Sequence, residues 1–195
     1  MVAQRHRQGF TLIELMVALA IAALLLVFGV PSFTTFLRNS EVRSTSESII
    51  NGLRAASAEA TRQNTRILFT VDGSGNWAFN LVKDPVECKD LEQPPIQRYY
   101  GKEAGANTKV ATTPDEKVSV CFNGLGRIVN QGVEPSDHIQ RIDIASMVCG
   151  EARPMRIIVD DPNKQLGLRM CDPDPALVTL NDPRACRDDI PIPSC

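Results

Sequence analysis

Glu14 is the residue whose type and position most clearly predict chemistry in this sequence. It is the single charged residue in an apolar run that extends from residue 10 to residue 30. A lone carboxylate in a membrane-spanning helix costs about 2.5 to 3.5 kcal/mol, so a partner of opposite charge is expected. Cleavage after Gly9 would free an ammonium group on Phe10, one helical turn before Glu14. In a neighbouring, axially displaced copy, that ammonium could approach the Glu14 carboxylate and pair with it.

The residues around this position also resemble a known signal. The segment Gly-Phe-Thr-Leu-Ile-Glu at 9–14 is similar to the class III signal of type IV pilins and pseudopilins. The resemblance implies that a prepilin peptidase cleaves after Gly9 and methylates the new N-terminal Phe10. It also implies that Glu14 helps to register a new subunit in a growing filament. An ordinary secretory signal differs, because its small residues follow the apolar region, whereas Gly9 precedes it.

The flanks of the apolar run predict its orientation in a membrane. Its 21 residues suffice to cross a bilayer core of about 30 Å at about 1.5 Å per residue. Arg5 and Arg7 precede the run, and no comparable basic cluster directly follows it. This asymmetry places the N-terminus in the cytoplasm and the bulk of the chain in the periplasm. We expect a cleaved leader at 1–9 and a single transmembrane or filament-core helix at 10–30, in the inner membrane before assembly.

A second helical segment continues the first. Pro31 lacks an amide proton and is predicted to kink the helix or to loosen one turn. From residue 42 the apolar residues recur at steps of three and four, with charged residues mostly elsewhere. This pattern predicts an amphipathic continuation over 31–63. One long helix over 10–63 would therefore have a membrane half and a half that packs on a head.

After Asn64 the apolar residues alternate, as in strands. Strands are predicted at 66–71, 77–82, 97–100, 109–112, 117–122, 127–129, 138–145, 153–159 and 165–171. Glycines at 72–76 and 123–126 favour tight reversals, and the last two predicted strands form a hairpin. A long N-terminal helix followed by an antiparallel meander indicates an α+β fold of the type IV pilin kind. Residues 64–195, about 130 in number, suffice for one periplasmic head.

Two later segments resemble the GspH/FimT group of minor pilins and pseudopilins. Residues 120–127 are similar to the group's strand-turn-Gly-Arg element, and residues 168–173 are similar to the end of its last strand. Some members carry Gly-Arg-x-Arg near that strand and are implicated in binding DNA. Here residues 166–169 read Leu-Gly-Leu-Arg, so only the final arginine is kept. A DNA contact would depend on Arg169, Arg184 and Arg187, unless these arginines pair with nearby aspartates.

Six cysteines beyond the export segment favour disulfides in an oxidising compartment. None has the C-x-x-C spacing of a zinc site, so no metal site is expected. Cys171 and Cys186 bracket a loop rich in Asp and Pro, and closing a loop of about 15 residues stabilises the fold by about 3 kcal/mol. We expect this pair. For the others, one of several possible arrangements joins Cys121 to Cys149 and Cys88 to Cys195.

Nothing in the sequence predicts an active site. Beyond the leader, His138 is the one histidine, and no phosphate loop, nucleophile elbow or pair of metal-binding histidines accompanies it. We therefore expect no catalytic residue and no cofactor. The aspartates of residues 172–189 have the carboxylates that calcium prefers, but Asp-Pro is common turn chemistry and is the simpler explanation. A net charge of −2 gives no overall field that attracts nucleic acid.

Three functions fit these features. The first is a minor pilin that primes assembly of a type IV pilus and lies at or near its tip. The second is a minor pseudopilin of a type II secretion system, which has the same parts. The third is a DNA receptor at the pilus tip. The resemblance implies other pilins or pseudopilins, the prepilin peptidase and an inner-membrane assembly platform as partners.

Overall fold

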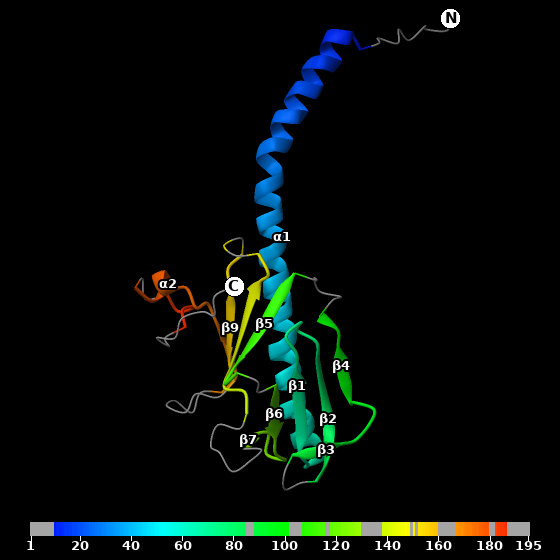
Figure 1. The fold of residues 1–195 in the computed structure, drawn as a ribbon, viewed down its shortest axis with the longest axis vertical. Coiled ribbons are helices and arrows are strands. Elements are labelled where there is room, and N and C mark those ends of the chain that lie inside the picture. The colour runs from blue at the N-terminus through cyan, green and yellow to red at the C-terminus, as the bar shows by residue number, and fades with distance from the viewer. Residues whose placement is uncertain are drawn as a thin grey trace, which may run out of the picture. The chain divides into compact units, whose positions relative to one another are not determined.

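The computed structural model describes most of the chain. The described residues are 10–84, 88–101, 107–115, 118–129, 138–148, 150, 152–159, 167–179 and 182–186. The chain divides into two compact units, Met1–Leu37 and Arg38–Cys195. The first unit contains the apolar part of helix α1 (Leu12–Gln63), and the second, which we call the head, contains the rest of α1 and the strands (Figure 1). The expected leader at 1–9 lies outside the described residues.

Helix α1 has nearly the bounds that the sequence predicts. The backbone is helical through Pro31, so the proline does not end the helix, and the kink expected there stays a prediction. The helix ends at Gln63 because Asn64 adopts a positive φ of 49°, which asparagine tolerates better than most residues. The amide of Asn64 donates to the carbonyl of Thr61, and that of Thr65 donates to Ala60. These two bonds satisfy carbonyls that the last turn would otherwise leave free.

Two antiparallel sheets form the rest of the head, where the sequence predicted one meander. The first sheet has the order β3-β2-β1-β6-β7, with β4 also paired to β2. Its strands are β1 (Ile67–Val71), β2 (Trp77–Asp84), β3 (Lys89–Leu91), β4 (Gln97–Tyr99), β6 (Ser119–Phe122) and β7 (Ile128–Val129). The hairpin of β1 and β2 forms as predicted, with Val71 opposite Trp77.

The second sheet has the order β10-β9-β8-β5. Its strands are β5 (Thr108–Thr113), β8 (Arg141–Ser146), β9 (Met155–Ile158) and β10 (Arg169–Cys171). The predicted hairpin of the last two strands is present as β9 and β10. A short helix, α2 (Pro175–Thr179), follows and was not predicted. The prediction of a single meander was wrong, because β1 pairs with β6 and β5 pairs with β8. These pairs join strands that are distant in the sequence.

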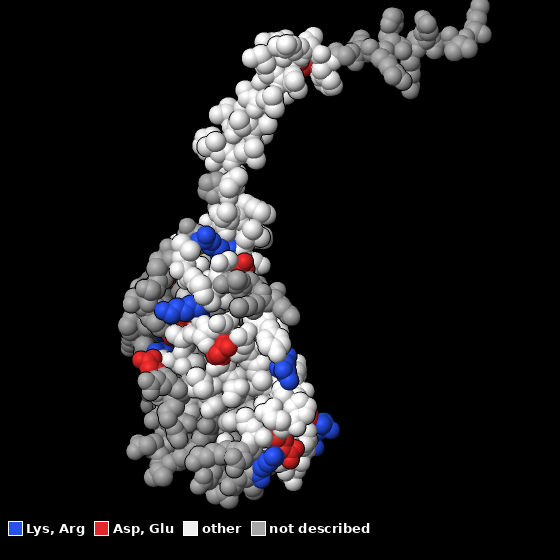
Figure 2. All heavy atoms as spheres, turned by 45° about the vertical axis from the view of Figure 1, so that its right-hand side comes forward, with Lys and Arg blue, Asp and Glu red and all other residues white. Residues whose placement is uncertain are grey.

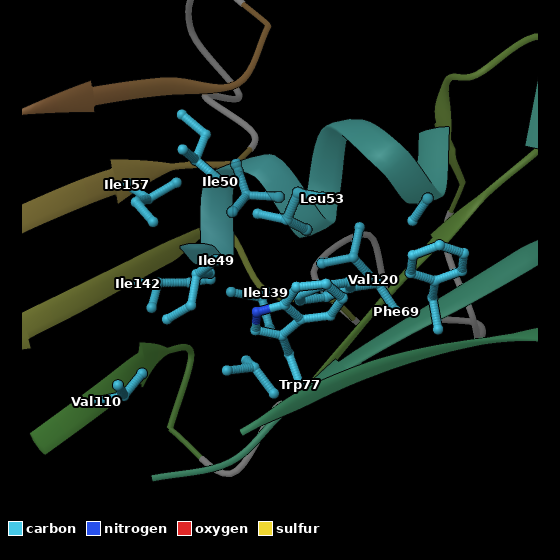
Figure 3. Close-up of a cluster of buried hydrophobic side chains, with 14 of the residues drawn as sticks. Ile49, Ile50, Leu53, Phe69, Trp77, Val110, Val120, Ile139, Ile142 and Ile157 are labelled. Carbon is cyan, nitrogen blue, oxygen red and sulfur yellow. The ribbon is translucent and has the colours of Figure 1, made fainter. Parts of the chain in front are cut away.

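The core lies between the second half of α1 and the inner faces of both sheets (Figure 3). The helix contributes side chains at steps of three and four, including Ile49 and Leu53, which are fully buried. Trp77 of β2 lies at the centre of an aromatic group, with its ring centroid 5.8 Å from that of Phe69. Its indole Nε1 donates to Ser48 Oγ on α1 at 2.9 Å, so the buried N–H has a partner. The amphipathic pattern of α1 thus fixes which face of the helix meets the sheets.

At Gly52 helix α1 lies close against the aromatic side chains of the first sheet. A Cβ atom at this position would lie 2.9 Å from two ring carbons of Trp77 and 3.0 Å from a ring carbon of Phe69. Gly52→Ala is therefore expected to destabilise the head by about 1 to 3 kcal/mol, because the packed rings must shift. This cost exceeds the gain of up to about 1 kcal/mol that alanine brings to a helix. Thermal unfolding of the full chain in detergent measures the change.

Gly29 supplies the matched control for this prediction. It is also a glycine of α1, but a Cβ atom there would meet nothing within 4 Å. Gly29→Ala should therefore leave the unfolding temperature of the head unchanged. Equal unfolding temperatures for the two variants would contradict the role assigned to the contact between Gly52 and Trp77.

Candidate functional site

The N-terminal end of α1 carries the residues that the sequence singled out for assembly. Phe10 is exposed, and Gly9 lies outside the described residues. The Glu14 amide donates to Thr11 Oγ1 at 3.3 Å, so Thr11 caps the first turn of the helix. The spacing Thr11-x-x-Glu14 is that of a capping box, which is a sequence signal for the start of a helix. The expectations from the sequence did not include this signal. The cap fixes Glu14 in the first helical turn, directly after the predicted cleavage site.

The apolar part of α1 is uncovered within the chain. It contains an 18-residue window of mean hydropathy 2.7, none of which is buried, and is long and apolar enough to cross a membrane. Figure 2 shows this segment as white side chains with a single red one, which is Glu14. Exposed side chains of leucine, isoleucine and phenylalanine surround the whole helix rather than one stripe. A helix apolar on all sides requires lipid or other protein around it.

In the part of the chain that the structure describes, two disulfides lie at the outer faces of the sheets. Cys171 is bonded to Cys186, as expected, with a Cα–Cα distance of 5.1 Å. Cys88 is bonded to Cys121, with a Cα–Cα distance of 6.4 Å, so the expected pairs of Cys121 with Cys149 and Cys88 with Cys195 were wrong. Cys149 and Cys195 lie outside the described residues.

The physical reason for the Cys88–Cys121 pair lies in the packing of the first sheet. Leu68 and Val82 point to the outer face, away from α1, and form a small buried cluster with the two cysteines. Cys88 lies directly before β3 and packs in this cluster beside Cys121 of β6. The loop that the bond closes spans 33 residues, for which the chain-entropy relation gives about 4 kcal/mol. The spacing of the cysteines in the sequence does not show which residues pack together on this face of the sheet, so it could not predict this pair.

A buried ion network occupies the outer face of the second sheet. Asp143 of β8 accepts a hydrogen bond from Nε of Arg156 on β9 at 2.6 Å, and one from Nε of Arg141 at 3.2 Å. Arg156 is 0% exposed and Asp143 is 3% exposed. Sequence reasoning missed this network. A signal was present, because Ile142 and Ile144 alternate with Asp143 and face the core, so Asp143 must lie on the opposite face.

These ion pairs bear directly on the predicted DNA contact. Arg141 and Arg156 pair with Asp143, and Arg184 pairs with Asp182 at 2.7 Å. Arg169 lies in β10 and is half-buried, while Arg187 lies outside the described residues. Of the three arginines named for a DNA contact, Arg184 is therefore paired with an aspartate, and the two further arginines, Arg141 and Arg156, share the single carboxylate of Asp143.

Comparisons with known protein families identify the family to which the chain belongs. Residues 4–30 match the prokaryotic N-terminal methylation motif. Residues 45–161, more than half of the chain, match the family described as type II transport protein GspH. The chain belongs to the GspH family. Members of this pilin-like group are structural proteins and not enzymes, so this GspH protein is a minor pilin or pseudopilin of a type IV pilus or a type II secretion system.

Solved structures share the fold of this GspH protein at low identity. The type IV minor pilin FimU of Pseudomonas aeruginosa aligns with a TM-score of 0.50 and 15% identity, over 70% of this chain and 91% of that one. The minor pseudopilin EpsH of the Vibrio cholerae type 2 secretion system gives 0.48 and 13%, over 69% and 98%. Escherichia coli GspH gives 0.44 and 16%, over 69% and 89%. The comparison with curated proteins found no match.

Family membership also indicates how the chain is processed and where it is located. The methylation motif implies cleavage by a prepilin peptidase, and the pilin-like family implies assembly with other pilins. The exposed apolar helix together with this motif is that of a pilin anchored in the inner membrane. The predicted α+β fold, a long apolar helix followed by an antiparallel head, is confirmed.

The aspartates of the C-terminal segment organise its backbone. Asp172 Oδ1 accepts from the amide of Asp174, and Asp174 Oδ1 accepts from the amide of Ala176 at 2.9 Å. Asp182 Oδ1 accepts from the amide of Arg184 at 2.8 Å. Contacts of this kind are the Asp turn chemistry that the sequence analysis gave as the simpler explanation of these aspartates than a calcium site. Among the described residues, no three His, Cys, Asp or Glu side chains form a group that could hold a metal ion.

Arg184 makes the Asp182 carboxylate unusually acidic. Its side-chain hydrogen bonds, with a smaller effect from its backbone amide, lower the pKa of Asp182 from 3.8 to about 2. Because the folded-state pKa is the lower one, the pair stabilises the fold above about pH 4, and this contribution is lost as the pH falls toward 2. In the variant Arg184→Gln the pKa of Asp182 is expected to return toward 3.8, as followed by NMR titration of the carboxyl carbons.

Arg62→Gln is the control for this titration. Hydrogen bonds from Arg62 and Gln63 lower the pKa of Glu59 to about 2, so this variant should raise the pKa of Glu59 and leave that of Asp182 unchanged. An Asp182 pKa near 2 in Arg184→Gln would show that other groups cause the shift.

A shallow groove of about 510 Å³ lies on the outer face of the first sheet. Its floor contains Thr70 and Ala78, which are opposite each other in β1 and β2. Its one acidic lining residue, Asp72, accepts hydrogen bonds from the amides of Ser74 and Asn76, and so holds the β1–β2 turn. His138 does not line this groove and is buried just before β8. The groove therefore contains no set of residues for catalysis, in agreement with a structural family.

Proposed function

We propose that this protein is a minor pilin that primes assembly of a type IV pilus and is incorporated at or near its tip. The observation that carries the proposal is the part of the helix over residues 12–30, which is apolar on all sides, uncovered and charged only at Glu14. Lipid surrounds such a helix before assembly, and the helices of neighbouring subunits replace the lipid in the filament. Glu14 is then the group that distinguishes the two environments, because a filament brings the Phe10 ammonium of a neighbouring subunit to it.

Each part of the chain has a separate task in this proposal. The leader at 1–9 holds the N-terminus in the cytoplasm until the peptidase removes it and methylates Phe10. Residues 10–30 anchor the protein in the inner membrane and later enter the filament core, where the Phe10 amine of a neighbour pairs with Glu14. Residues 31–63 continue the helix into the head, where residues 38–63 pack on the sheets, and the head lies in the periplasm and then on the pilus. The assembly platform of the inner membrane moves the subunit between these states.

The fold that this chain shares with Pseudomonas aeruginosa FimU supports a pilus subunit. FimU is a type IV minor pilin, and its structure has the same fold as this chain. The second candidate function, a minor pseudopilin of a type II secretion system, is favoured by one specific observation, the match of residues 45–161 to the type II transport protein GspH family. We do not propose a DNA receptor, since Asp182 pairs with Arg184, and only the last arginine of the Gly-Arg-x-Arg element is kept, as Arg169.

Mass spectrometry of filaments sheared from the cell surface tests the proposal. We expect a peptide that begins at N-methylated Phe10 in the sheared fraction, in amounts far below those of the major subunit. Deletion of the gene should lower the number of pili, because priming precedes elongation. The processed peptide confined to the cell envelope would favour the pseudopilin. An uncleaved leader in every fraction would contradict both.

A further inference from the structure

The connection between β8 and β9 lies at the end of the head where the chain enters it. Arg38 is the first residue of the head and follows Leu37 directly in the chain. The amide of Arg153, in this connection, donates to Oδ1 of Asn39 on α1 at 2.8 Å. The amide of Met147, at the other side of the connection, donates to the carbonyl of Asn107 at 2.7 Å. In Figure 1 the connection is the yellow loop beside α1.

Two neighbouring apolar side chains are exposed in this connection. Met147 is 56% exposed and Val148 is 42% exposed. Their backbone is held in place, because the Val148 amide also donates to Ser146 Oγ at 3.2 Å. Single exposed apolar residues are ordinary on protein surfaces. An adjacent pair at the end of the head where the chain enters it is a more specific feature.

Basic side chains accompany this apolar pair. Arg153 is exposed, and so is Lys109, which lies at the same end of the second sheet because Thr108 pairs with Ser146. On the first turns of α1 in the head, Glu41 is half-buried and Glu47 is paired with Arg43 at 2.8 Å. Apolar side chains together with lysine and arginine are the composition of surfaces that bind the interface of anionic membranes.

We propose that Met147, Val148, Lys109 and Arg153 form a membrane-docking surface, which holds the head of the unassembled subunit against anionic lipid headgroups. The proposal rests on the proposed function for the insertion of residues 10–30 in a bilayer. Asn39 lies nine residues after Val30, the last residue of this anchor, which corresponds to about 14 Å along a helix. The docking surface therefore lies at the end of the head that is nearest to the anchor along the chain. Release of this surface accompanies the transfer of the subunit into a filament.

Leu125 provides an internal comparison. It is 75% exposed, more than either Met147 or Val148, but it lies in the turn after β6. Ser57 Oγ donates to the carbonyl of Gly126 in that turn at 2.9 Å, so the turn lies near the C-terminal end of α1, away from Arg38. Leu125 and the docking surface are thus at opposite ends of the helical segment of the head. Exposure alone predicts lipid contact at both ends, and docking predicts contact only at Met147.

Photochemical cross-linking of the full chain in vesicles distinguishes docking at Met147 from lipid contact that follows from exposure alone. The photoreactive residue p-benzoylphenylalanine replaces Met147, Leu125 or Leu24 in turn, and the vesicles contain phosphatidylglycerol or only phosphatidylcholine. We expect at least fivefold more lipid adduct from position 147 than from 125 in phosphatidylglycerol vesicles. The combined variant Lys109→Gln and Arg153→Gln should lower the adduct from position 147 severalfold, since each basic group near an anionic surface contributes about a factor of five. High salt should have the same effect.

The outcomes distinguish the two proposals. Lipid adducts from position 24 without an excess at 147 over 125 would overturn the docking surface and leave the membrane anchor intact. Protein adducts from position 147, to a second copy of the chain, would also overturn it. A position 24 that forms no lipid adduct would overturn the membrane insertion itself, and the docking with it. Unfolding temperatures equal to that of the wild type confirm that the labelled variants are folded.

Discussion

Replacement of Glu14 by alanine is expected to reduce the amount of this protein in sheared filaments at least tenfold. The variant removes a carboxylate whose cost inside the bilayer is about 2.5 to 3.5 kcal/mol, so the membrane-inserted state becomes more favourable. It also removes the proposed partner of the Phe10 ammonium in the filament. Both changes shift the subunit toward the membrane, and about 1.4 kcal/mol suffices for a tenfold shift. Quantitative immunoblots of the sheared and envelope fractions measure the ratio.

Leu15→Ala is the matched control for Glu14→Ala. Leu15 is the next residue of the same exposed helix, so its truncation changes the apolar surface and keeps the charge. We expect this variant to enter filaments at nearly the wild-type level. The total amount of protein should be equal in all strains, which excludes degradation as the cause. Recovery of Glu14→Ala in filaments at the wild-type ratio would mean that the carboxylate has no part in registering the subunit.

Replacement of Asp143 by alanine is expected to cause the largest loss of stability in the head. Asp143 and Arg156 are both buried and joined at 2.6 Å, and Arg141 contacts the same carboxylate. Removing one member of a buried pair costs about 3 to 5 kcal/mol, because the remaining charge keeps its desolvation penalty. At about 2 to 4 °C per kcal/mol for a chain of this size, the unfolding temperature should fall by about 6 to 20 °C. Circular dichroism of the full chain in detergent measures this.

The variant with both Asp143→Leu and Arg156→Met separates charge burial from packing. Replacing a whole buried pair by apolar side chains of similar volume is often neutral, so this variant should unfold above Asp143→Ala. Asp182→Ala is the control for a surface pair, since Arg184 is well exposed, and should remain close to the wild type. An unfolding temperature of Asp143→Ala within about 2 °C of the wild type would contradict the assigned network, given the expected size of the loss.

Local patterns in the sequence predicted the elements of this fold well. The apolar run and the steps of three and four after residue 42 predicted α1, since a helix needs only its own backbone bonds and one consistent face. Alternation predicted β1, β2, β6, β8 and β9, and glycines marked the reversal between β1 and β2. The strand β3 and the helix α2 were missed, because each is short and lies in a segment rich in proline or aspartate.

By itself the sequence determined the anchor, the family and the pair Cys171–Cys186, because each depends on residues close together in the chain. The tertiary structure alone decided the pairing of β1 with β6, the bond between Cys88 and Cys121, and the burial of Arg156 against Asp143. These contacts join segments whose distance in space is unrelated to their spacing in the sequence. The pairing and register of the strands are set by the packing of the whole head, and the register of β8 with β9 places Arg156 opposite Asp143.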